Sequence, residues 1–107
     1  MFKRYQPKGM KLGFENDSVR VSNHEIAFSE EVYEKCFGKM KSIALYFDSD
    51  TNQIALKGDN IGYNINHTKA GYKTVRWGGF VKGIKFDYAP PQMKKIKQIG
   101  ELWVIEK

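Results

Sequence analysis

Residues 18–57, SVRVSNHEIAFSEEVYEKCFGKMKSIALYFDSDTNQIALK, decide the fold class. Polar and apolar residues alternate over 18–22, which predicts a half-buried strand, and a second strand over 25–28 follows a turn at Asn23-His24. Ser29 is a good N-cap, acidic residues follow it, and Gly38 ends the helical apolar spacing, so a helix is predicted over 30–37. Strands at 42–47 and 53–57 flank the turn formers of 48–52 and predict a hairpin.

The remainder of the chain extends this pattern. Between glycines, short strands are predicted at 63–66, 72–77 and 80–88. Pro90-Pro91 predicts the start of a helix over 92–99, with Met93, Ile96 and Ile99 inward and Lys94, Lys95 and Lys97 outward, closed by Gly100. The apolar run of 101–105 predicts a final, central strand. The expected fold is one α+β domain over 1–107, mostly antiparallel β-sheet with two short α-helices.

Length and composition limit the class of protein. The chain has 107 residues, of which 41% are apolar and 14% aromatic, enough for one packed core and too short for two. We find no apolar run long enough to span a bilayer and no apolar segment near the start, so we expect neither a membrane association nor a signal peptide. The single cysteine, Cys36, fits a reducing compartment, and we expect a cytoplasmic protein.

The net charge of +6 is distributed unevenly along the chain. Residues 1–14 hold four basic residues and no acidic one, residues 15–59 hold five basic against nine acidic, and residues 60–107 hold nine basic against three acidic. The segment at 1–14 also contains proline and glycines, so a basic arm or an edge strand is expected there. Such an uneven distribution of positive charge either keeps the protein soluble or attracts a polyanion: nucleic acid, anionic lipid or an acidic protein.

The order strand, turn, strand, capped helix, Gly, strand, turn, strand in 18–57 resembles the swapped-hairpin DNA-binding domains of the AbrB/MazE type. Phe37-Gly38 and the hairpin from Ile43 to Lys57 carry the resemblance, which covers about 40 of the 107 residues. The proline usual at the helix start is replaced by Ser29-Glu30. The basic residues usual around the first turn are mostly absent, and only Arg20 occupies a comparable place. The resemblance implies DNA binding and an intertwined homodimer; without it, a monomeric sheet explains the same pattern.

Basic residues interleaved with aromatic residues in 60–99 suggest a nucleic-acid site. Cations neutralise phosphates and exposed aromatic rings stack on bases, although in alternating strands aromatics ordinarily point into the core and lysines into water. The candidate contact residues are Lys3, Arg4, Lys8 and Lys11 in the arm, with Tyr72, Lys73, Arg76, Trp77, Lys82, Lys85, Lys94, Lys95 and Lys97 further along. We expect Arg76, Trp77, Lys73 and Lys82 to form the central contact.

Residues that often carry catalysis or bind metal show no diagnostic spacing. Asp48 to Asn52 resembles half of a calcium loop, but a hairpin turn explains it better, since Gln53 occupies the place of the required glycine. The two histidines, His24 and His67, form no zinc pattern, and Cys36 lies on the expected apolar helix face. We expect no cofactor, no metal and no catalytic residue. An enzyme would instead require His24, Cys36 or the aspartates to converge in one pocket.

Two functions follow from these features. The first is a small, basic, non-catalytic nucleic-acid-binding protein; if it neutralises about five phosphates, log K should fall with log[salt] with a slope near −4.5. The second is an interaction or inhibitor protein, of the type that phages and mobile elements encode, that docks on a larger acidic protein or nucleoprotein partner.

Overall fold

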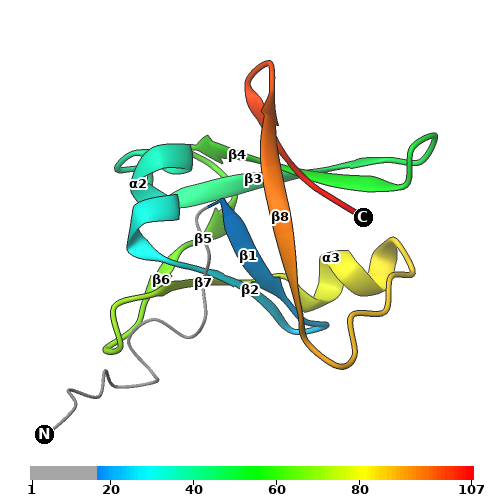
Figure 1. Cartoon of the computed structure of the whole chain (residues 1–107), viewed down its shortest axis with the longest axis horizontal. Coiled ribbons are helices and arrows are strands. Elements are labelled where there is room, and N and C mark those ends of the chain that lie inside the picture. Colours follow the sequence, from blue (N-terminus) through cyan, green and yellow to red (C-terminus); the bar gives the residue numbers. More distant parts are fainter. Residues whose placement is uncertain (1–16) are drawn as a thin grey trace, which may run out of the picture.

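The computed structural model describes residues 17–107, in which nine strands form one antiparallel sheet with two short helices beside it (Figure 1). The predicted basic arm at 1–14 lies outside the described residues. In chain order the elements are β1 (Ser18–Val21), β2 (Glu25–Phe28), α2 (Glu30–Phe37), β3 (Ser42–Asp48), β4 (Gln53–Asp59), β5 (Tyr63–Asn64), β6 (Asn66–His67), β7 (Lys73–Arg76), α3 (Gly78–Gly83), β8 (Gln92–Ile99) and β9 (Leu102–Ile105).

The helix α2 forms where the sequence predicts it. The Ser29 hydroxyl accepts a hydrogen bond from the Val32 N–H at 3.2 Å, which satisfies one of the free donors of the first turn. At the other end Gly38, with a φ of 62°, donates its N–H to the Glu34 carbonyl at 3.2 Å. Val32 and Phe37 are buried under the helix, so α2 closes over one end of the sheet.

The strand order is β5-β3-β4-β9-β8-β1-β2-β7-β6. The long strand β8 holds the sheet together, because its first half pairs with β1 and its second half with β9. The sheet curls until β5, at one end, contacts β7, near the other, so that it forms a nearly closed barrel. β9 lies between β4 and β8, which confirms the prediction of a central final strand.

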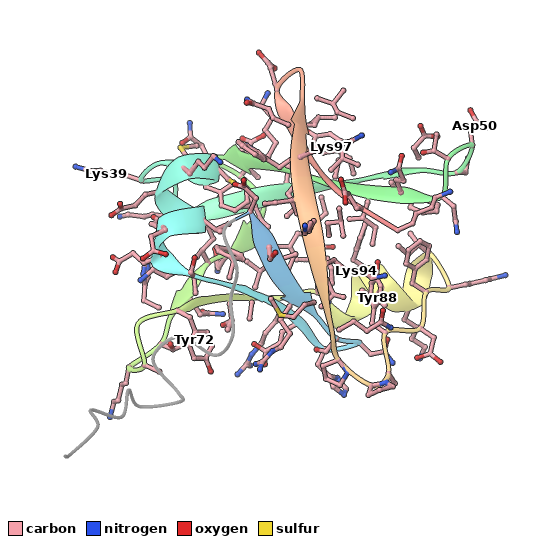
Figure 2. All side chains as sticks on the ribbon, in the orientation of Figure 1. Lys39, Asp50, Tyr72, Tyr88, Lys94 and Lys97 are labelled. Carbon is pink, nitrogen blue, oxygen red and sulfur yellow. The ribbon has the colours of Figure 1, made fainter. Side chains whose placement is uncertain are left out.

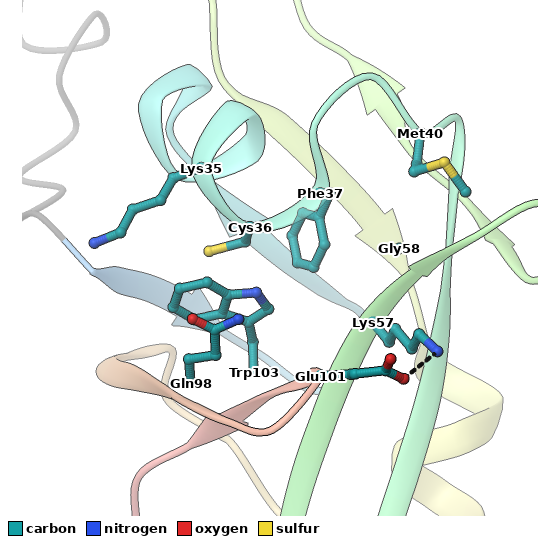
Figure 3. A pocket seen from close by; sticks show the side chains of 9 residues that line it. All are labelled: Lys35, Cys36, Phe37, Met40, Lys57, Gly58, Gln98, Glu101 and Trp103. Atoms are coloured by element: carbon teal, nitrogen blue, oxygen red, sulfur yellow. Dashed lines mark hydrogen bonds and ion pairs between the residues drawn. The ribbon is translucent and has the colours of Figure 1, made fainter.

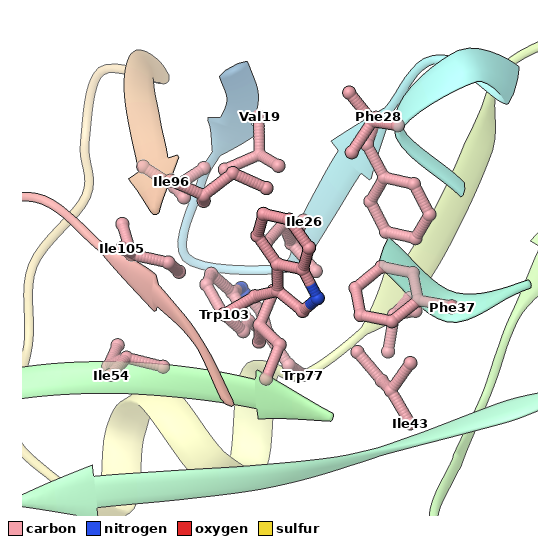
Figure 4. Packing of buried hydrophobic residues seen from close by; sticks show 14 of the residues in the cluster. Val19, Ile26, Phe28, Phe37, Ile43, Ile54, Trp77, Ile96, Trp103 and Ile105 are labelled. Atoms are coloured by element: carbon pink, nitrogen blue, oxygen red, sulfur yellow. The ribbon is translucent and has the colours of Figure 1, made fainter. Parts of the chain in front are cut away.

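The inner face of this curled sheet is the core. Val19, Ile26, Phe28, Ile43 and Trp77 are each fully buried. Figure 4 shows these side chains directed together with those of other strands and with Phe37 from α2. Their neighbours along each strand point the opposite way, onto what we call the outer face of the sheet. No helix in residues 17–107 has the length and apolar character needed to cross a membrane.

Two predicted elements are wrong. Residues 92–99 form the strand β8 and not a helix, because Gln92–Lys95 pair with β1 and Ile96–Ile99 with β9. Gly100, predicted to end that helix, has a φ of 62° and occupies the two-residue turn that joins the paired residues Ile99 and Leu102. Residues 80–88, predicted as strand, instead continue α3 to Gly83 and then form a turn and a loop.

Candidate nucleic-acid interface

Three cations lie on the outer face of β8 and its partner strand β1. Lys95 faces Ser18 and Arg20 faces Met93, and facing residues of antiparallel strands share one side of the sheet. Lys97 lies two residues beyond Lys95 on β8, about 7 Å along the strand. We call Arg20, Lys95 and Lys97 the β8 stripe.

The stripe is accessible and electrostatically unbalanced. Lys95 and Lys97 are exposed and Arg20 is half-buried. Within residues 17–107 none of the three has an acidic partner within 4 Å, in contrast to Lys35, Lys57 and Lys73. Within the described part of the chain, these three positive charges on one face are therefore not neutralised by an ion pair.

Apolar side chains flank the stripe. Met93 is 41% exposed and Ile99 53% exposed, and both share the outer face of β8 with Lys95 and Lys97. Next to Ile99, the residues Ala55, Leu102 and Val104 line a groove of about 340 Å³ that is open to solvent and bordered by Tyr46. We call this set, with Ile99 and Tyr46, the outer groove.

Lys94 lies on the other side of β8 from Lys95, as a consequence of strand geometry. Its half-buried side chain lines a groove of about 300 Å³ together with Tyr88, Asp87 and Lys107. Figure 2 shows Lys94 beside Tyr88 on the lower half of β8 and Lys97 on its upper half. In the predicted helix Lys94, Lys95 and Lys97 all point outward. In the strand β8, Lys95 and Lys97 share the outer face and Lys94 lies on the opposite face.

The other predicted cations lie on separate elements. Arg76 ends β7, Lys82 belongs to α3, and Lys85 occupies the turn after it; all three are exposed. Lys73 is only 6% exposed, and its Nζ lies 4.0 Å from the Glu30 carboxylate. The expected central contact of Arg76, Trp77, Lys73 and Lys82 is therefore wrong for Lys73, whose ammonium faces α2.

Trp77 is fully buried, so its ring is not available to stack on a base. Its indole packs parallel to the Tyr88 ring, with centroids 6.0 Å apart, and Phe80 lies on the same tryptophan at 6.2 Å. The expectation of a stacking role for Trp77 is thus corrected to a role in the core. Tyr72 is half-buried next to β7.

Sequence reasoning missed two members of this surface. The sequence points to Arg20 only through the resemblance to the AbrB/MazE type, and Tyr46 is not among the residues that the sequence suggests for contact. Tyr46 is 42% exposed on the outer face of β3. The signal was present in the alternation of 42–48, because inward Ile43, Leu45 and Phe47 leave Tyr46 outward.

A pocket of about 490 Å³ with a mixed polar and apolar lining opens between α2 and the β8–β9 turn (Figure 3). The Lys57 ammonium binds the Glu101 carboxylate at 3.0 Å across it, and this hydrogen bond raises the pKa of Lys57. Burial raises the pKa of the Cys36 thiol to about 12, against a weaker opposing effect of Lys35. The thiol is therefore protonated at neutral pH and is a poor nucleophile.

The residues suited to catalysis or metal binding are dispersed. His24 lies in the β1–β2 turn, Cys36 in α2, and Asp48 at the β3–β4 hairpin. Among residues 17–107 no three His, Cys, Asp or Glu side chains are placed to hold a metal ion. The Asp48 carboxylate instead accepts the Asp50 N–H at 2.8 Å, which confirms the predicted hairpin turn.

The element order of residues 18–57 agrees with the order predicted from the sequence, while the resemblance to the AbrB/MazE type stays a prediction. No family model, no curated protein and no solved structure matches this chain.

Proposed function

We propose that the protein is a small, non-catalytic nucleic-acid-binding module that neutralises phosphates with the β8 stripe. One observation carries this proposal: Arg20, Lys95 and Lys97 project from one face of the paired strands β1 and β8 with no acidic partner among the described residues. Fixed cations on a sheet release condensed counterions when they meet phosphates, which gives affinity without sequence specificity.

The neighbouring side chains suit the same ligand. Met93, Ile99 and Tyr46 place apolar and aromatic surface on the face that carries the stripe. Such surface contacts sugars and bases once the phosphates are held, and an exposed tyrosine ring stacks on any base. Exposed Arg76, Lys82 and Lys85 on other elements would add long-range attraction.

Fluorescence anisotropy with labelled single-stranded and double-stranded oligonucleotides, across a salt series, tests the proposal. The key variant is the triple change Arg20→Gln, Lys95→Gln and Lys97→Gln. The control removes the same charge from exposed lysines outside the stripe: Lys39→Gln, Lys41→Gln and Lys69→Gln. We expect the stripe variant to bind more weakly, with a salt slope on duplex shallower by about 2.7.

Three outcomes of this binding experiment distinguish the possible functions of the stripe. Absence of binding by the wild-type protein at low salt would refute a nucleic-acid function. Equal weakening by the two triple variants would show that net charge alone matters and that the stripe is not the interface. A stronger effect on single strands would assign part of the affinity to stacking.

The outer groove favours a second candidate function, docking on a protein partner. Ile99 is 53% exposed there, next to the cationic stripe. Such a surface fits a partner that presents apolar side chains flanked by acidic ones. Copurification of one stoichiometric protein from the native host, disrupted by Ile99→Asp and combined with no oligonucleotide binding, would support it over the first.

A further inference from the structure

Strand β3 has an unpaired edge. β5 covers only its start, where Ser42 faces Asn64 and Ile43 faces Tyr63. From Ala44 to Asp48 the strand pairs with β4 on one side and with no described strand on the other. This part belongs to the long hairpin that projects from the body of the molecule in Figure 1.

The open edge carries four unsatisfied main-chain groups. The Ile65 N–H donates to the Lys41 carbonyl at 2.9 Å, so the polar groups of Lys41 point toward β5. Main-chain groups alternate sides along a strand, and those of Leu45 and Phe47 therefore point the same way, beyond the end of β5. No residue in 17–107 donates to them or accepts from them on that side.

We propose that a second copy of this chain pairs with this edge, β3 against β3, antiparallel and related by a two-fold axis at Tyr46. In this register Leu45 of each copy faces Phe47 of the other. The pair exchanges four hydrogen bonds, two on each side of the axis, and all four edge groups of each copy are then satisfied. Since the same surface serves both copies, the contact closes on itself as a dimer.

The side chains of the same register are complementary. On the outer face the exposed Tyr46 of one copy lies opposite Tyr46 of the other, in a pair with the closer spacing of about 4.5 Å between Cα atoms. On the inner face half-buried Leu45 and Phe47 meet, which extends the apolar surface across the junction. Aromatic and aliphatic cross-strand pairs of this kind stabilise sheets.

Charges also match across the axis. Asp48 of one copy comes to lie beside Ala44 of the other, and Ala44 faces Lys57 on β4. The Asp48 and Lys57 backbones are then two strand spacings apart, roughly 10 Å, which a lysine side chain can span. In one copy Lys57 binds Glu101 at the surface, where 84% of the glutamate side chain is exposed. The Lys57 ammonium can therefore also interact with Asp48 of the second copy. The attraction occurs twice by symmetry.

The composition of this edge favours pairing. Monomeric proteins protect such edges with lysine, proline or a bulge. Between Ala44 and Phe47 the edge has none of these, and its sequence is Ala-Leu-Tyr-Phe. Asp48, at the end of this edge, repels a strand that carries an acidic residue opposite it, and it attracts Lys57 of a second copy.

Disulfide trapping in the full chain, without nucleic acid, tests the proposal. In a Cys36→Ala background we expect Tyr46→Cys to form a covalent dimer under mild oxidation, because facing Cα atoms at this spacing suit a disulfide. The control is Ile99→Cys, an exposed position on the same outer face but away from the edge, which should stay monomeric. Equal cross-linking at both positions would overturn the register.

Sedimentation velocity gives a second, independent reading. The wild-type protein should shift from monomer to dimer between micromolar and millimolar concentration, and Tyr46→Lys should abolish the shift while Ile99→Lys keeps it. Asp48→Lys should weaken the dimer and the double variant Asp48→Lys with Lys57→Asp should restore it. A wild-type monomer at all concentrations would overturn the proposal, as would a dimer that Ile99→Lys disrupts and Tyr46→Lys does not.

Discussion

The indole Nε1 of Trp77 donates a hydrogen bond to the main-chain carbonyl of Ser22 at 2.8 Å. It joins the end of β7 to the β1–β2 turn, 55 residues away in the chain. A second link runs beside it, from the Trp77 N–H to the His24 carbonyl at 3.1 Å. Trp77 is therefore an anchor between two hairpins, which explains why a tryptophan among lysines and glycines is buried.

Replacement of Trp77 should cost stability. Trp77→Phe keeps an aromatic ring but removes the donor to Ser22, and we expect a loss of about 1–3 kcal/mol in the free energy of unfolding. Trp77→Ala should cost about 3–5 kcal/mol, because it also leaves a cavity. Urea unfolding followed by far-UV circular dichroism measures both. Tyr63→Phe, at a ring that is 38% exposed, should change stability by less than about 0.5 kcal/mol. Equal losses for Trp77→Phe and Tyr63→Phe would contradict the anchoring role.

The strand geometry of β8 separates the effects of two adjacent lysines. Lys95 belongs to the exposed stripe, whereas Lys94 lies on the other side of the strand and is half-buried. We expect Lys95→Gln to weaken nucleic-acid binding and to make the duplex salt slope shallower by about 0.9, and Lys94→Gln to have a clearly smaller effect.

Because the two changes remove the same charge, each variant is the control for the other. Anisotropy across a salt series measures them, and melting temperatures show whether both variants fold. In the helix predicted from the sequence both lysines point outward, so equal losses of affinity would argue against the assignment of the interface to one face of a strand.

The sequence was sufficient for the elements of 18–57 because local and tertiary signals agree there. Ser29 caps α2, Gly38 ends it, and the alternation of the flanking strands matches the side that is buried. Local preference and the final structure point the same way, as they do in a consistent sequence.

The predictions for residues 80–88 and 92–99 are wrong because contacts distant in the chain decide the structure of these segments. The helix α3 contains three glycines and has no side-chain cap, yet it forms where Val81 is buried against the core. In β8 the spacing of Met93, Ile96 and Ile99 fits a helix, but β1 and β9 both pair with this segment, and those ladders outweigh local spacing. The available signal was Gly100-Glu101, a hairpin turn between Ile99 and Leu102.

Gly62 approaches β3 too closely for any side chain. A Cβ at this position would lie 2.2 Å from the Ile43 carbonyl oxygen and 3.2 Å from the Ala44 nitrogen, both main-chain atoms. Gly62→Ala should therefore displace β5 and reduce the free energy of unfolding by more than about 2 kcal/mol. Urea titration measures the loss, and hydrogen exchange of the Ile65 amide should accelerate.

Gly79→Ala provides the matched control for this change. Nothing lies within 4 Å of a Cβ at Gly79, which belongs to α3. Alanine restricts the unfolded chain and favours a helix, so stability should rise by about 0.5–1 kcal/mol. If both alanine variants change stability in the same direction, the close contact of Gly62 with β3 does not determine how Gly62→Ala changes the free energy of unfolding.

The half-buried thiol of Cys36 predicts slow modification and a dependence of stability on alkaline pH. Burial raises its pKa to about 12 from an ordinary value near 9. At neutral pH the folded protein should react with a disulfide reagent far more slowly than the urea-unfolded chain, because only the thiolate attacks.

The unfolded chain releases the thiol proton first as pH rises above about 9, so the folded state loses stability from there until its own thiol ionises. Lysines and tyrosines titrate in the same range, and Cys36→Ala separates their contribution: its unfolding midpoint in urea should fall less between pH 8 and about pH 11 than that of the wild-type protein. Equal reaction rates for folded and unfolded protein, or parallel pH curves for the two proteins, would show that the thiol is not held in its protonated form by the fold.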